Sequence, residues 1–288
     1  MGVNKRLLEG ILLACRERAL GDVVMIGRLG FAVRPGSVSR IFARYKRPLN
    51  KEVLSKITSS KFAEDLLREL GATRVDSIDV SDYQGASIIQ DMSEPIEVEH
   101  AGKFDTLLDG GTIEHIFDVP QAMENYLNLL RVGGRLICMT AANNFCGHGF
   151  YQFSPEFWYS LFEANHCTNI RVFLVPTRTD APWFEVMSPK DLKGRVEVIN
   201  AEPTFVIAMA EKTADTPSKL IKPHQSDYEN SEWSGTRIAK PVRAPMPQLA
   251  RATRAIVTAV MKPFGRKAVL AFGLSDHPNV TAFDPAAD

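Results

Sequence analysis

The hydrophobic positions along the chain follow two different periods. Apolar residues recur at helical spacing in Val3–Ala19, Phe62–Leu70, Val119–Arg131 and Pro155–Ala164. Apolar runs of strand length lie between and after these segments: Asp22–Ile26, Val75–Val80, Ser87–Gln90, Phe104–Leu108, Arg135–Thr140, Asn169–Val175, Arg195–Asn200 and Thr204–Met209. This alternation predicts an α/β fold with a mostly parallel sheet, and the last strands are expected to form an antiparallel edge.

The pattern also divides the chain into two regions. Residues 1–212 hold the predicted elements, with a basic insertion at 34–61 that carries eight basic residues against the single acid Glu52. That insertion is either a lid beside the first turn or plain surface decoration. Residues 213–288 are expected to form a C-terminal extension, partly loop or disordered, because 213–248 is polar and rich in Pro and Ser. Within the extension, 247–262 is compatible with a basic amphipathic helix.

Composition narrows the class of protein. The 288 residues are 45% hydrophobic, enough for a real core, and 34 basic residues balance 34 acidic ones, so no global charge favours nucleic acid or a membrane surface. The apolar run Ile11–Cys15 is too short for a membrane span or a signal-peptide core. Four cysteines show no CxxC pair and no metal-ligand spacing with histidine, so we expect a reduced, cytoplasmic protein and predict no metal site.

The central segment Phe104–Trp158 predicts where a ligand binds. Its two strands each run at the carboxyl end into Gly, acidic, His or Asn residues, with a helix between them. Ligands of open α/β sheets bind beyond the carboxyl ends of the strands, so Asp109–His115 and Ala141–Gln152 should face one pocket. The Gly-rich turn Gly27–Gly30 follows the first strand, and Asp79, at the end of the second, is placed to accept hydrogen bonds from ribose hydroxyls.

Two stretches of this segment resemble a known family. FDTLLDGGTIEHIFD, followed by LLRVGGRLI, is similar to the fourth and fifth strand regions of class I S-adenosylmethionine-dependent methyltransferases, particularly the small-molecule group. The resemblance covers roughly residues 20–212. It implies a Rossmann-like, seven-stranded sheet with helices on both faces and S-adenosyl-L-methionine as cofactor. The implied cofactor-binding residues are Gly27 and Gly30 under the methionine part, Arg28 at its carboxylate, Asp79 at the ribose, Asp91 and Met92 near the adenine, and Asp109 and Gly110 at the border.

The first turn departs from the family pattern. An acid followed by glycines at alternate positions is usual, but Met25 stands at the acid position, Leu29 at the middle glycine and Phe31 at the last. A bulky Leu29 keeps the cofactor away unless the turn is rebuilt. We therefore weigh two hypotheses: a small-molecule methyltransferase, and a non-catalytic methyltransferase-like binding or scaffold module.

Methyl transfer to an oxygen or nitrogen requires alignment and, for some acceptors, a base. His148 is the first candidate base, with Glu114, His115 and Tyr151 as catalytic neighbours. Candidate substrate-binding residues are Asn143, Asn144 and Gln152. The alternatives remain open: His148 can be structural, His115 can cap a helix, and the loop aromatics can simply pack on the core.

Several other functions fit less well. No tyrosine is followed four residues later by lysine, and the chain has no P-loop GKS/GKT, GxSxG or HExxH motif. No Asn-Pro-Pro-aromatic motif follows Asp109, which lowers the case for nucleic acid as substrate. We expect a small polar or sugar-like substrate, with a homo-oligomer or a protein partner through the C-terminal extension left open.

Overall fold

The computed structural model describes residues 2–192, 196, 198, 200–215, 219–226 and 280–287. Its elements, in chain order, are β1 (Gly2–Val3), α1 (Lys5–Ala14), β2 (Gly21–Ile26), β3 (Gly30–Phe31), α2 (Pro35–Arg44), α3 (Lys51–Ser59), α4 (Glu64–Glu69), β4 (Ala72–Asp79), β5 (Ile88–Ile89), η1 (Val98–His100), β6 (Phe104–Asp109), η2 (Ile113–His115), α5 (Val119–Leu129), β7 (Leu130–Asn143), α6 (Pro155–Ala164), β8 (Cys167–Pro176), β9 (Trp183–Val186), α7 (Pro189–Leu192), β10 (Thr204–Lys212) and β11 (Val280–Phe283). The predicted helix at 247–262 lies outside the described residues.

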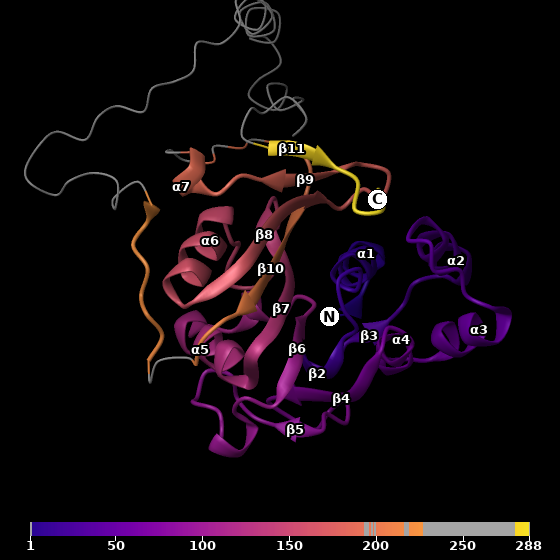
Figure 1. Cartoon of the computed structure of the whole chain (residues 1–288), viewed down its shortest axis with the longest axis horizontal. Coiled ribbons are helices and arrows are strands. Elements are labelled where there is room, and N and C mark those ends of the chain that lie inside the picture. The colour runs from indigo at the N-terminus through magenta and orange to yellow at the C-terminus, as the bar shows by residue number, and fades with distance from the viewer. Residues whose placement is uncertain are drawn as a thin grey trace, which may run out of the picture.

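One large sheet organises the protein (Figure 1). Its strand order is β11-β9-β8-β10-β7-β6-β2-β4-β5. The five strands from β7 to β5 are parallel, whereas β10, β8, β9 and β11 join by antiparallel pairing. The predicted α/β, Rossmann-like sheet with an antiparallel edge is therefore confirmed.

The sheet has nine strands in the described structure, two more than the seven predicted, and both additional strands lie at the antiparallel edge. Strands β9 and β11 extend it, and β11 comes from the far end of the C-terminal extension, pairing Val280 with Val186 and Phe283 with Trp183. Of the predicted strand Arg195–Asn200, the described residues Val196, Val198 and Asn200 are not in a strand. That stretch alternates apolar and polar side chains, but β9 occupies the sheet position beside β8 instead.

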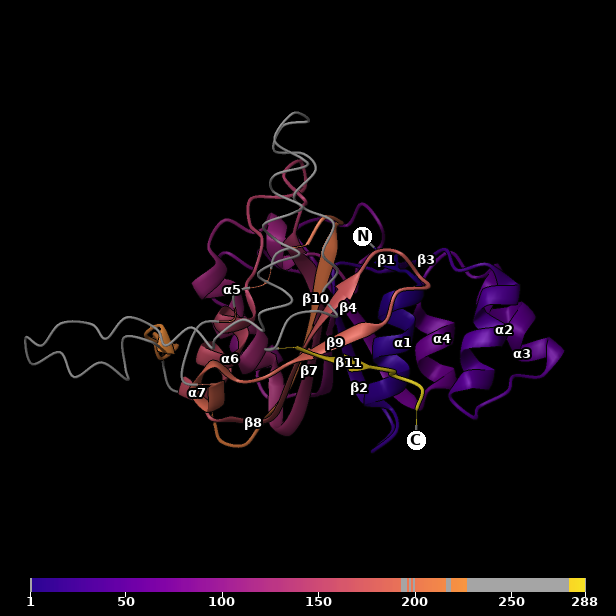
Figure 2. The ribbon, with the colours of Figure 1, turned by 90° about the horizontal axis from the view of Figure 1, so that it is seen from above.

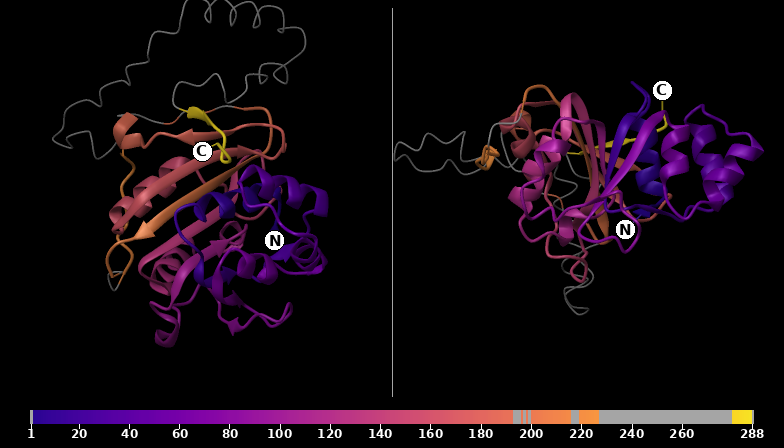
Figure 3. Two further views of the ribbon diagram at one scale, coloured as in Figure 1. Left: turned by 45° about the vertical axis from the view of Figure 1, so that its right-hand side comes forward. Right: turned by 90° about the horizontal axis from the view of Figure 1, so that it is seen from below.

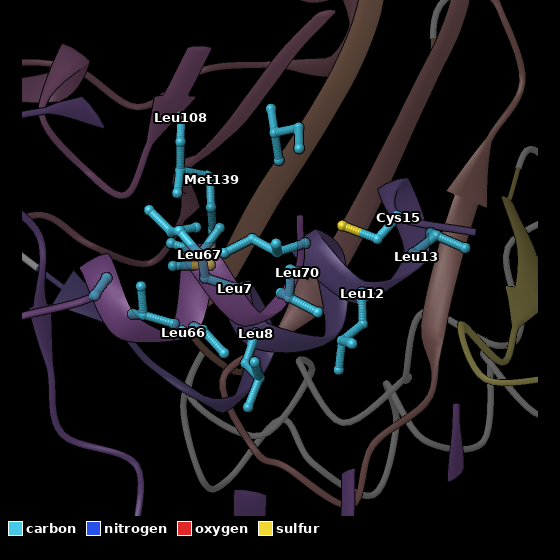
Figure 4. Close-up of a cluster of buried hydrophobic side chains, with 14 of the residues drawn as sticks. Leu7, Leu8, Leu12, Leu13, Cys15, Leu66, Leu67, Leu70, Leu108 and Met139 are labelled. Atoms are coloured by element: carbon cyan, nitrogen blue, oxygen red, sulfur yellow. The ribbon is translucent and has the colours of Figure 1, made fainter. Parts of the chain in front are cut away.

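Helices cover both faces of the sheet, with α1 and α4 on one side and α5 and α6 on the other (Figure 2). Successive strand residues point to opposite faces, so Val23 and Met25 join the apolar cluster under α1, while Val24 and Ile26 join the cluster under α5 and α6. Figure 4 shows the first cluster, with leucines of α1 and of the α4 region against strand residues Leu108 and Met139.

Side-chain caps fix where three of these helices begin. Asn4 accepts a hydrogen bond from the Leu7 amide at 3.0 Å, Asp118 caps α5 through Gln121 at 3.1 Å, and Ser154 caps α6 through the Phe157 amide at 3.4 Å. Proline in the first turn of α5 and α6 fits the helix start, since the amide it lacks would be unpaired there. The helix α6 spans the predicted range Pro155–Ala164.

The basic insertion 34–61 contains two helices rather than loop. Figure 3 shows α2 and α3 as an outer layer, on the side of α1 and α4 away from the sheet. Val38 and Phe42 of α2 are buried, and the Tyr45 hydroxyl donates to the Glu9 carbonyl of α1 at 2.9 Å. The basic residues of the insertion are exposed, but two of them reach back to α1: Arg44 Nη1 lies 3.0 Å from Glu9 Oε1, and Arg47 donates to the Cys15 carbonyl at 3.0 Å. Across the described residues, no helix is long and apolar enough to cross a membrane.

Candidate active site

The carboxyl ends of three central strands meet at one edge of the sheet. Ile26 of β2 pairs with Ile78 of β4 on one side and with Asp109 of β6 on the other. The residues that follow these positions, Gly27 and Asp79 among them, therefore lie side by side, as the crevice rule for open sheets requires. The sequence prediction that these segments share one edge is consistent with this register.

Asp109 is the anchor of the turn after β6. Its buried carboxylate accepts hydrogen bonds from the amides of Gly111 (3.0 Å), Thr112 (2.7 Å) and Ile113 (3.1 Å), and from the Tyr126 hydroxyl at 2.9 Å. Burial, together with the nearby negative charge of Glu114, raises the pKa of Asp109 to about 6. Both carboxylate oxygens of Asp109 already accept hydrogen bonds from the protein, so this residue fixes the conformation of the turn after β6.

Glu114 holds the two loops of the site together. Its main-chain carbonyl accepts hydrogen bonds from the amides of Phe150 (2.7 Å) and Tyr151 (3.3 Å), which belong to the loop after β7. Its side chain is buried, and Oε2 accepts a 2.6 Å hydrogen bond from the Thr140 hydroxyl of β7. The loop after β6 and the loop after β7 are thus joined through both the backbone and the side chain of one residue.

Three predicted catalytic residues converge here. His148 Nε2 lies 3.4 Å from Glu114 Oε1, and the His148 and His115 rings are in edge contact with centroids 4.9 Å apart. Burial, followed by the proximity of His148, lowers the pKa of His115. Tyr151, the fourth predicted catalytic residue, donates its hydroxyl to the Phe117 carbonyl at 2.9 Å.

Glycine at position 149 permits this arrangement. Gly149 has φ +70°, and a Cβ there would lie 2.5 Å from the Glu114 carbonyl oxygen. Gly147, two residues earlier, has open space where a Cβ would be. The GHG sequence around His148 therefore contains one glycine that the fold requires and one that it does not.

The predicted substrate-binding residues tie the loop to its surroundings. Asn143 donates to the Asn200 side chain at 2.6 Å, and Asn144 donates to the Glu202 carbonyl at 3.0 Å. Gln152 closes the loop by accepting the Phe145 amide at 2.9 Å. Their part in binding an acceptor stays a prediction, while their part in holding the loop is visible in these contacts.

The first turn, Gly27–Gly30, is closed in the sense that the buried Leu29 side chain fills the space beside Gly110. Gly27 has φ +69°, and its amide donates to the Ile78 carbonyl at 2.7 Å. Leu29 is fully buried, and its side chain stands over Gly110: a Cβ on Gly110 would lie 3.0 Å from Leu29 and 2.9 Å from Leu7. Gly30 forms part of β3, which pairs with β1. Leu29, at the middle glycine position, therefore belongs to the buried apolar cluster under α1.

The Arg28 side chain already forms an ion pair and a hydrogen bond within the protein. Its Nε lies 2.7 Å from Glu64 Oε1, its Nη1 donates to the Gln84 carbonyl at 2.8 Å, and its guanidinium stacks over the Phe62 ring. This arginine bridges the first turn and the segment after β4. A role at a cofactor carboxylate would require it to exchange these partners.

The acidic residues predicted at the ribose and the adenine, Asp79 and Asp91, make fewer side-chain contacts within the described protein than Arg28 does. Within the described part of the chain, the Asp79 carboxylate accepts a long hydrogen bond, 3.4 Å from the Ser81 amide, and the Asp91 carboxylate accepts one at 2.8 Å from the Ser93 amide. Met92 is buried in the cluster under α5, with its carbonyl accepting from Asn125 at 3.0 Å. Asp79 thus retains hydrogen-bonding capacity at the end of β4.

Three residues that the sequence reasoning missed complete the site: Thr140, Tyr126 and Asn200. Thr140 and Tyr126 each bind a buried carboxylate, and Asn200 receives the Asn143 amide. Thr140 carried a usable signal, because it is a polar residue at the end of an otherwise apolar strand. Tyr126 and Asn200 carried none, since each acts on a residue distant in sequence.

Similarity to known proteins is found among solved structures and is low. No family model matches the chain, and no curated protein matches its sequence. Among solved structures, a Burkholderia thailandensis 1,6-didemethyltoxoflavin-N1-methyltransferase is similar at 17% identity over 73% of this chain and 78% of its own, with a TM-score of 0.39. A Thermotoga maritima SAM-dependent methyltransferase gives 18% identity over 72% and 88%, TM-score 0.37. NodS from Bradyrhizobium japonicum, an N-methyltransferase, gives 13% over 73% and 94%, TM-score 0.39.

The strand order itself agrees with the resemblance seen in the sequence. Seven strands from β8 to β5 form a sheet with helices on both faces and one antiparallel strand, β10, inserted between β7 and β8. The described residues therefore form the Rossmann-like α/β sheet that the resemblance implies.

Proposed function

We propose that the protein is an S-adenosylmethionine-dependent methyltransferase that acts on an oxygen or nitrogen of a small polar metabolite or sugar-like substrate. The observation that carries the proposal is that Asp79 and the cluster of Glu114, His115 and His148 follow the carboxyl ends of strands in a single sheet. This edge is where ligands of such sheets bind.

The residues present fit one half of the cofactor. Asp79 retains carboxylate acceptors for a ribose, and Asp91 with Met92 lies along the chain beyond it. The methionine half meets the closed turn, where Leu29 fills the space over Gly110. We infer that Asp79, Asp91 and Met92 hold the nucleoside, and that the turn around Leu29 rearranges when the donor binds.

The side chains at the opposite end of the site would handle the acceptor. A sulfonium methyl transfers by direct displacement, so the protein contributes mainly alignment, worth up to about 7–11 kcal/mol in ideal cases. His148 is half exposed and lies against a buried carboxylate, an arrangement suited to taking a proton from an acceptor. Asn143, Asn144 and Gln152, which hold the loop, would fix the position of His148.

Replacing Asp79 tests where the donor binds. Asp79→Ala should weaken the binding of S-adenosylhomocysteine by more than about 10-fold, because it removes charge-assisted hydrogen bonds to the ribose. Asp82→Ala, an exposed acid three residues later, is the matched control and should leave the dissociation constant unchanged. Calorimetric titration measures both. Equal affinity in Asp79→Ala and the wild type would show that the nucleoside does not lie at the end of β4.

The closed first turn favours a second candidate. A module that has lost donor binding would place a core leucine at position 29 and pair Arg28 with Glu64, as this protein does. Such a protein would act as a binding or scaffold partner. The two functions differ in one measurable property, the affinity for S-adenosylmethionine or its product.

A further inference from the structure

Glu114, His115 and His148 bring three metal-ligating groups into one small space. A carboxylate oxygen and two imidazole nitrogens, one from each residue, all lie within 4.8 Å of one another. Glu114 Oε1 and His148 Nε2 are 3.4 Å apart. Two ligands bound tetrahedrally to a single ion at about 2.0–2.1 Å are separated by about 3.3 Å, so this pair already has the spacing of a shared metal.

We propose that these three side chains bind one divalent first-row transition-metal ion such as Zn²⁺. Imidazole favours Zn, Fe and Ni over Mg or Ca, so two histidines with one carboxylate select this class of ion. Three protein ligands also leave a coordination position open, as in catalytic rather than structural sites. That position can take an oxygen or nitrogen of the acceptor.

The ligand set is held in place by contacts outside it. Glu114 is buried, and the Thr140 hydroxyl occupies its Oε2 at 2.6 Å, which leaves Oε1 directed at His148. The amide of Phe150 donates to the Glu114 carbonyl at 2.7 Å and holds the loop that carries His148. Gly149 allows this close approach, because a Cβ there would lie 2.5 Å from that carbonyl. Partners of this kind orient metal ligands and tune their affinity.

Charge also favours a cation here. Within the described part of the chain, the one ion pair of Glu114 is with His148, whose side chain is half exposed. A second buried acid, Asp109, lies nearby, and its pKa is raised first by burial and then by the negative charge of Glu114. A buried carboxylate without a full positive partner is costly, and a divalent ion would offset that cost.

A second group, formed by Glu97, Glu99 and His100, offers a comparison. It also brings three ligand-type atoms within 4.8 Å, but both acids are exposed and only one imidazole is present. Exposed acidic groups of this kind rarely hold a transition ion strongly. His100 therefore supplies an internal control.

This proposal deepens the proposed function and rests on it only for the role of the ion. A bound metal would polarise the acceptor group, and the His148 nitrogen would then serve as a ligand instead of a free base. No metal-binding motif is visible in the sequence, because the ligands come from two segments separated by α5 and β7.

Equilibrium dialysis with Zn²⁺ tests the site directly. The full-length protein should bind one ion, and His115→Ala or His148→Ala should each weaken binding by more than about 10-fold, whereas His100→Ala should leave it unchanged. X-ray absorption at the zinc edge should show two imidazoles per ion in the wild type. Loss of binding in His100→Ala alone, or a spectrum without imidazole, would overturn the assignment.

Two further pairs test the positioning. Gly149→Ala should reduce Zn²⁺ affinity by displacing the His148 loop, while Gly147→Ala, in open space, should not. Thr140→Val should lower the affinity for Zn²⁺ by about 10–100-fold, because Glu114 Oε2 loses its hydrogen bond from the Thr140 hydroxyl. A circular dichroism spectrum should confirm that the variant is folded.

Zn²⁺ dialysis and the calorimetric titration with S-adenosylhomocysteine, carried out on the same protein, separate this proposal from the proposed function. Absence of Zn²⁺ binding with S-adenosylhomocysteine binding intact would overturn the metal site alone. Zn²⁺ binding without S-adenosylhomocysteine binding would support the metal site and remove the methyltransferase proposal.

Discussion

Asp109→Ala is expected to lower the free energy of unfolding by about 3–5 kcal/mol. The substitution leaves the amides of Gly111, Thr112 and Ile113 and the Tyr126 hydroxyl without their buried acceptor. Chemical denaturation monitored by circular dichroism measures the loss. Asp180→Ala, which breaks an exposed ion pair with Arg178, is the control and should change stability by less than about 0.5 kcal/mol. A similar small change for Asp109→Ala would refute its role as anchor.

The same carboxyl group predicts a pH dependence. Its folded-state pKa of about 6 lies above the ordinary value of 3.8, so the folded protein binds a proton that the unfolded chain releases between these values. Stability should therefore fall as pH rises from about 4 to 6, by up to about 3 kcal/mol from this group. Asp109→Asn removes this titration, and the difference between wild-type and variant slopes isolates it. Parallel slopes would contradict the raised pKa.

The second large effect concerns turnover. His148→Ala should lower the methylation rate on the order of 10²–10⁴-fold, whether His148 takes a proton or holds a metal, because both proposals place this side chain, beside Glu114, at the acceptor. Release of S-adenosylhomocysteine from a panel of polar acceptors gives the readout. His224→Ala, on an exposed histidine, is the control. Full activity in His148→Ala, with an active wild type, would remove His148 from the chemistry.

The sequence predicted the parallel core of the fold because its strands are apolar runs with clear boundaries. Phe104–Leu108 and Arg135–Thr140 lie within β6 and β7, and the helical spacing of Pro155–Ala164 matched α6. The two strands at the antiparallel edge were missed. β9 is a four-residue strand, and β11 lies about 70 residues beyond the rest of the sheet, so neither leaves a pattern that a local window detects.

The candidate site also has a part that the sequence predicted and a part that it did not. His148, Glu114 and His115 were predicted as neighbours, because the residues after adjacent strands meet at one edge. What could not be predicted is how the contacts are distributed. The strand pattern does not reveal that the Asp109 carboxylate accepts the amides of its own turn. The approach of both Leu7 and Leu29 to Gly110 depends on packing between segments distant in sequence.

The central claim is that the carboxyl edge of this sheet binds a methyl donor. Isothermal titration of the wild-type protein with S-adenosylhomocysteine tests it most directly. We expect one site per chain with a dissociation constant on the order of 1–100 μM. The absence of binding up to about 1 mM, with the protein shown to be folded, would contradict the claim and leave the non-catalytic module as the account of this fold.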